Sequence, residues 1–138
     1  LALDLGKGSL GIAISRSGLF VTPLANLRFK AGDYEEALNG LKKVTKNETV
    51  DLVVIGWPLF PSGDECEMTP IIRAFISKLE TLFPDRKIVP VDERNWTVEA
   101  SALLHEGGKN AKQQKRNIDS AAASVILTRY LTSIGQIR

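Results

Sequence analysis

A change of hydrophobic pattern near residue 33 constrains the fold more than any other feature of the chain. Before it, the short apolar segments 1–5, 10–15 and 24–29 are separated by glycine-containing turns. This spacing predicts three strands in an antiparallel meander. After it, the pattern alternates between helices and strands, predicted at 34–46 (helix), 51–56 (strand), 70–83 (helix), 88–91 (strand), 97–105 (helix) and 115–133 (helix). The order predicts an α/β fold, in which a mixed sheet carries helices on its faces.

The length and the residue types narrow the class of protein. A chain of 138 residues, 43% hydrophobic and 25% charged, is expected to form a single globular domain over residues 1–138. No signal peptide or membrane-spanning run is visible. Cys66 and His105 are the only residues of their kinds, which excludes a disulfide framework, a thiolate zinc cluster and a multi-histidine metal site. We therefore expect a cytoplasmic protein and, if it binds metal, carboxylate ligands and an oxygen-preferring ion.

Three acidic residues occupy segments that are expected to be buried. Asp4 interrupts the first apolar strand, Glu93 follows the last predicted strand, and Asp119 opens a run of small residues in the last helix. On that helix Asp119 shares a stripe with Ala122, Ala123, Ile126 and Tyr130. A buried carboxylate is costly unless it is paired, hydrogen-bonded or bound to metal. A shared metal site would explain all three acids at once.

Each acid also has a purely structural interpretation. Asp4 could cap a turn beside Gly6, Glu93 could pair with Arg94, and Asp119 could favour the positive end of its helix. Taken one at a time, the local patterns leave these alternatives open.

Two segments have the composition of phosphate-binding elements. Gly6, Gly8 and Gly11 surround Lys7 directly after Asp4, and backbone amides of such a turn can hold a phosphate, although a tight hairpin also explains the glycines. The stretch 109–116 contains Lys109, Lys112, Lys115 and Arg116 and no acid. It is either a nucleic-acid contact or an ordinary solvated surface, because the net charge of the chain is only +2.

Taken in order, four motifs make the chain resemble a known family. They are Asp4-x-Gly6 with Leu10-Gly11, Gly56-x-Pro58, residues 92–100 with the sequence DERNWTVEA, and residues 119–123 with the sequence DSAAA. The set resembles the YqgF/RuvX family of pre-16S rRNA nucleases, also described as Holliday-junction-resolvase-like proteins. The resemblance covers essentially the whole chain. The chain departs from the common pattern at Lys7, which stands one place earlier than the usual basic residue. It also departs from it at Trp57 and Trp96.

The resemblance implies an RNase H-like fold with a five-stranded mixed sheet, three strands antiparallel and two parallel. It also implies that Asp4, Glu93 and Asp119 converge on Mg²⁺ or Mn²⁺, with two ions expected, in a nuclease that processes the 5′ end of the 16S rRNA precursor during ribosome biogenesis. In this hypothesis Asp4 bridges the ions. The candidate substrate contacts are Lys7, Arg94, Lys112, Lys115 and Arg116.

Several alternatives remain at this level. Trp57 and Trp96 could stack on unpaired bases or pack in the core. The partner is expected to be precursor rRNA or a pre-ribosomal particle, but branched DNA presents the same phosphates, and a resolvase would need a symmetric dimer rather than a monomer. The opening hairpin also resembles the phosphate motif of actin-like ATPases and sugar kinases, which need two such domains. A catalytically silent RNA-binding assembly factor is the third possibility.

Overall fold

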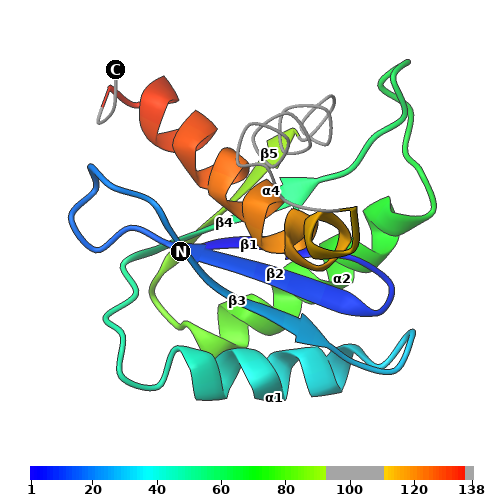
Figure 1. Cartoon of the computed structure of the whole chain (residues 1–138), viewed down its shortest axis with the longest axis horizontal. Helices are drawn as coiled ribbons and strands as arrows, with labels where there is room; N and C mark the ends of the chain where they lie inside the picture. Colours follow the sequence, from blue (N-terminus) through cyan, green and yellow to red (C-terminus); the bar gives the residue numbers. More distant parts are fainter. Residues whose placement is uncertain (93–110, 136–138) are drawn as a thin grey trace.

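In the computed structural model, which describes residues 1–92 and 111–135, one five-stranded sheet organises the chain (Figure 1). The strand order is β3-β2-β1-β4-β5. The strands are β1 (Ala2–Leu5), β2 (Ser9–Ile14), β3 (Thr22–Arg28), β4 (Leu52–Trp57) and β5 (Lys87–Asp92). The first three strands are antiparallel, while β4 is parallel to β1 and β5 is parallel to β4. The predicted RNase H-like mixed sheet is therefore confirmed.

The described helices are α1 (Tyr34–Val44), α2 (Met68–Leu82) and α4 (Ala111–Ser133). The Asp33 side chain caps α1 by accepting a hydrogen bond of 3.1 Å from the Glu36 amide, as its position predicts. Helix α2 begins two residues before the predicted start, so that Pro70 lies within its first turn, where a missing amide hydrogen costs nothing. Helix α4 begins four residues before its predicted start. The predicted helix 97–105 lies outside the described residues.

Alternate residues of the sheet pack on different helices. Leu1, Leu3 and Leu5 share one buried cluster with residues of α1 and α2. Ala2 belongs to the other cluster, which it shares with Ala123, among other residues of α4. Helix α4 crosses this second face over β1 and β2 (Figure 1). The strand periodicity thus assigns each residue of β1 to the helices it meets.

The strand boundaries differ from the predicted ranges by one or two residues, and the largest difference is at the start of β3. Strand β3 begins at Thr22 and therefore contains Pro23. Proline is tolerated there because β3 lies at the edge of the sheet, and the register between β2 and β3 shifts at Ile12/Ala13 beside it. Whether a strand lies at an edge is decided by the whole sheet, so the local pattern could not show it.

Candidate active site

Asp4 is buried on the α4 face of the central strand. It is 7% exposed and lies between Leu3 and Leu5, which belong to the cluster with α1 and α2. Because successive side chains of a strand point to opposite faces, Asp4 shares the α4 face with Ala2. The neighbour of Asp4 on this face is therefore a small residue.

The strand pairing adds residues that periodicity alone does not identify. Gly11 of β2 lies directly opposite Asp4, and Asn26 of β3 lies opposite Gly11. Directly paired residues share a face, so Asp4 and Asn26 lie in one row with no side chain between them. On the other side, β1 pairs in parallel with β4 as far as Leu3 and Ile55, and Gly56 is the next residue of β4. The glycine opposite Asp4 places no side chain beside the carboxylate on the β2 flank.

The second predicted acid, Glu93, follows the end of β5 in the sequence. Since β1, β4 and β5 are parallel, their carboxyl ends lie at the same end of the sheet. Strand β5 ends at Asp92, which pairs with Trp57 at the end of β4. Glu93 is the next residue, but Glu93, Arg94 and Trp96 lie outside the described residues. The topology thus places Asp92, the residue before Glu93, at the same end of the sheet as Asp4.

The third predicted acid belongs to the helix that covers this face. Asp119 lies in α4, four residues before Ala123 and seven before Ile126, and both of these pack against the sheet. Lys112, Lys115 and Arg116 belong to the first half of the same helix. Side chains are described only from Ala122 onward in α4, so the roles of these four residues stay predictions.

The donor chemistry at Asp4 fits a hard divalent cation. The buried Asp4 carboxylate offers the anionic oxygen ligand that Mg²⁺ and Mn²⁺ prefer, and Gly11 opposite it adds no competing side chain. Among the described side chains, no three His, Cys, Asp or Glu residues come together as a metal cage. Of the predicted ligands only Asp4 has a described side chain.

Lys7, the predicted phosphate contact, makes an ion pair. Its Nζ lies 2.7 Å from Oε1 of Glu67, the residue just before α2. The hydrogen bond to Glu67, together with the attraction of its charge, holds the pKa of Lys7 above the ordinary value. The lysine is therefore cationic at every physiological pH.

The loop after β4 is fixed beneath this edge by hydrogen bonds. The Thr69 hydroxyl is fully buried; it donates to the Pro58 carbonyl at 2.7 Å and accepts from the Cys66 amide at 2.9 Å. Trp57 packs against the α1/α2 cluster, and the guanidinium carbon of Arg73 lies 5.4 Å from its ring centroid. Trp57 therefore packs against the core. It lies on the sheet face opposite Asp4.

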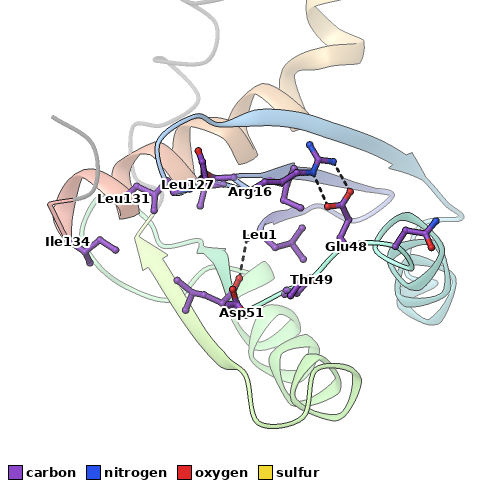
Figure 2. A pocket seen from close by; sticks show the side chains of 15 residues that line it. Leu1, Arg16, Glu48, Thr49, Asp51, Leu127, Leu131 and Ile134 are labelled. Atoms are coloured by element: carbon purple, nitrogen blue, oxygen red, sulfur yellow. Dashed lines mark hydrogen bonds and ion pairs between the residues drawn. The ribbon is translucent and has the colours of Figure 1, made fainter.

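A separate cavity opens at the other end of the sheet (Figure 2). It measures about 820 Å³ and lies at the amino ends of β1 and β4, against the last turns of α4. Arg16 and Glu48 form a two-point ion pair at its wall, with distances of 3.0 Å and 2.6 Å. The described residues that line it include neither Asp4 nor Lys7. It is therefore not part of the carboxylate site.

Three residues at this site were not predicted from the sequence as functional neighbours. Gly11 is part of the glycine-rich turn and of the first family motif but is not predicted to lie opposite Asp4, while Asn26 and Glu67 give no signal at all. Asn26 reaches the row of Asp4 through strand register, and Glu67 reaches Lys7 through the position of α2. Both contacts depend on tertiary structure, so an isolated sequence pattern could not have found them.

Comparison with known proteins agrees with this architecture. Residues 1–133 match the family described as "RuvX: Holliday junction resolvase". A protein of Mycoplasmopsis pulmonis named "Putative pre-16S rRNA nuclease" is 36% identical, with 100% of this chain and 95% of that protein covered. Proteins of the same name from Chlorobium luteolum and Chlorobium phaeobacteroides are 34% and 32% identical, over 95% and 98% of this chain and 92% of each relative. The chain belongs to the RuvX family.

Proposed function

We propose that this protein is a metal-dependent nuclease that hydrolyses phosphodiester bonds in the 5′-end processing of pre-16S rRNA. The observation that carries the proposal is the placement of Asp4, a buried carboxylate on the α4 face with Gly11 directly opposite. The names of the relatives support the nuclease class and the rRNA substrate. Such a substrate implies a cytoplasmic protein.

Asp4, Glu93 and Asp119 are the proposed ligands of Mg²⁺ or Mn²⁺, with two ions expected. Bound ions of this kind would activate a water molecule and neutralise the charge of the phosphate. In this proposal Asp4 supplies an oxygen ligand from the central strand β1, which pairs with β2 on one side and with β4 on the other. Lys7, Arg94, Lys112, Lys115 and Arg116 are the proposed contacts to the nucleic-acid backbone, which position a strand without reading its sequence.

The decisive experiment compares cleavage of a single-stranded RNA carrying the precursor junction with and without Mg²⁺ or Mn²⁺. We expect Asp4→Asn, Glu93→Gln and Asp119→Asn each to lower the rate by about 100-fold or more, because each removes a charged ligand. Glu80→Gln, at an exposed position of α2, is the matched control and should cleave as the wild type does. Undiminished cleavage by the three variants would contradict the proposed ligand set.

Metal binding can be measured without activity. A metal concentration of about ten times Kd should stabilise the wild-type fold by about 1.4 kcal/mol and leave Asp4→Asn nearly unchanged in thermal unfolding. Equal stabilisation of both proteins would exclude Asp4 as a ligand.

The description of the matched family favours one alternative, the cleavage of Holliday junctions. A four-way DNA junction should therefore be assayed beside the RNA, together with the mass in solution. A resolvase needs two active sites related by symmetry and is expected to be a dimer, whereas RNA processing is compatible with a monomer. RNA binding without any metal-stimulated cleavage would instead indicate a silent assembly factor.

A further inference from the structure

The ion pair between Lys7 and Glu67 joins two separate segments near the carboxyl end of β1, where the active site is proposed. Lys7 belongs to the turn between β1 and β2, and Glu67 immediately precedes α2. Their charged atoms are 2.7 Å apart, while the side chains are 57% and 73% exposed. Lys7 is three residues beyond Asp4, so their Cα atoms are at most about 11 Å apart. The pair therefore lies within reach of a nucleic-acid strand bound at Asp4.

The backbones on both sides of the pair are fixed. The Gly32 amide donates to the Lys7 carbonyl at 2.9 Å, and the Gly6 amide donates to the Ser9 carbonyl at 2.8 Å. On the other side, Thr69 attaches the start of α2 to the Pro58 carbonyl. The two charged side chains can therefore separate without movement of the backbone.

The Glu67 side chain does not cap its own helix. Its side chain makes no capping hydrogen bond to α2, so the helix does not depend on its present position. An exposed ion pair adds little to stability, and breaking it costs little. A phosphate of a bound strand can therefore replace the Glu67 carboxylate at Lys7.

We propose that Glu67 is a specificity-determining residue that competes with substrate phosphate for Lys7, so that a strand binds firmly only when other contacts also hold it. This inference rests on the proposed function, because it takes the strand at Asp4 to be a nucleic acid. When a phosphate takes its place, Glu67 is left beside an anionic backbone and repels it. The carboxylate thus lowers the affinity of the protein for every strand. A strand with few other contacts then no longer binds, whereas a strand with many contacts still does.

The test is a double-mutant cycle on binding. The probe is a fluorescein-labelled single-stranded RNA of twelve nucleotides, measured by anisotropy in EDTA so that it is not cleaved. We expect Glu67→Gln to tighten binding by about three- to tenfold, and to do so less than about twofold in a Lys7→Gln background, because coupled residues are not additive. Glu67→Gln should also steepen the dependence of log K on log salt by about 0.7, the value for one additional phosphate contact on a single strand.

The matched control is Glu35→Gln. Glu35 pairs with Lys78 between α1 and α2, so this variant removes the same charge from another exposed ion pair. It should change the Kd by less than about twofold, the size expected from net charge alone. Equal effects of Glu35→Gln and Glu67→Gln would overturn the inference, as would an unchanged effect of Glu67→Gln in the Lys7→Gln background.

The result can be separated from that of the nuclease assay. Absence of metal-stimulated cleavage together with the expected coupling would reject the nuclease and retain Glu67 as a competitor in an RNA-binding protein. Cleavage without coupling would retain the nuclease and reject the role of Glu67. Failure of the wild type to bind the RNA in EDTA would reject the role of Glu67, while the nuclease is judged by the cleavage assay with metal.

Discussion

At the scale of single residues, four charged side chains are divided between two ends of the sheet. Asp4 and Lys7 lie towards the carboxyl end of β1, where the function is proposed. Arg16 and Glu48 lie at the amino end and hold the turn after β2 to the segment before β4. Asp4 and Lys7 belong to the proposed site, whereas Arg16 and Glu48 pair with each other and join two segments of the fold.

The Arg16–Glu48 pair predicts a pH-dependent stability. The hydrogen bond from Arg16 holds the pKa of Glu48 below its ordinary value of 4.5. A carboxyl whose pKa is depressed by folding contributes stability above its unfolded pKa and loses it as pH falls through the folded value. We therefore expect Arg16→Gln to be less stable than the wild type at pH 7, and this difference to shrink progressively below pH 4.5.

Urea unfolding at a series of pH values checks this expectation. Arg16→Lys is the informative control, because it keeps the charge and loses the two-point geometry, and it should lie between the wild type and Arg16→Gln. A difference that is independent of pH would show that Arg16 acts through packing of its aliphatic stem instead.

At the scale of elements, α1 packs closely against the edge strand through a glycine. A Cβ added at Gly40 would meet Cδ1 of Leu27, in β3, at 2.8 Å. The helix therefore contains a residue of poor helical propensity because the sheet needs the space. This is a case in which packing between elements overrides local preference.

The effect of a substitution at Gly40 on stability should consequently change sign when Leu27 is replaced by a smaller residue. Gly40→Ala gains about 0.5–1 kcal/mol of helical propensity but adds overpacking of about 1–3 kcal/mol, so we expect a net loss of up to about 2.5 kcal/mol. In a Leu27→Ala background the clash is absent, and the same substitution should stabilise by about 0.5–1 kcal/mol. Chemical denaturation of the four proteins measures both effects. Stabilisation by Gly40→Ala in the wild-type background would show that Leu27 yields freely.

At the scale of the whole molecule, small residues set the distance between α4 and the sheet. Ala2, Ala13, Ala122 and Ala123 are all fully buried, and three of them lie in the cluster between β1, β2 and α4. The same helix carries Asp119, one of the proposed metal ligands. Among the described residues no helix is sufficiently long and apolar to cross a membrane.

Enlarging Ala123 should therefore damage stability and activity together. Ala123→Leu is expected to cost about 1–3 kcal/mol of unfolding free energy by overpacking and to lower cleavage, because α4 must move away from β1. Thr128→Leu introduces the same side chain at an exposed position of α4 and should change stability by less than about 0.5 kcal/mol. Unfolding curves and initial cleavage rates give the two readouts. Normal cleavage by a folded Ala123→Leu protein would mean that the site tolerates displacement of α4.

The sequence by itself determined the order of the elements, the two faces of β1 and the cap of α1. These follow from periodicity and from short-range hydrogen bonds, which nearby residues control; Asp4 could therefore be assigned to the face of Ala2, opposite Leu3 and Leu5. Family motifs then proposed Glu93 and Asp119 as its partners.

Only the tertiary structure decided which distant residues meet. It placed Gly11 and Asn26 in the row of Asp4, Glu67 beside Lys7, and Leu27 against Gly40. It also decided that β3 is an edge strand able to contain Pro23. The physical reason is that strand register and helix position result from packing of the whole core, so a contact between distant segments leaves no signature in either segment alone.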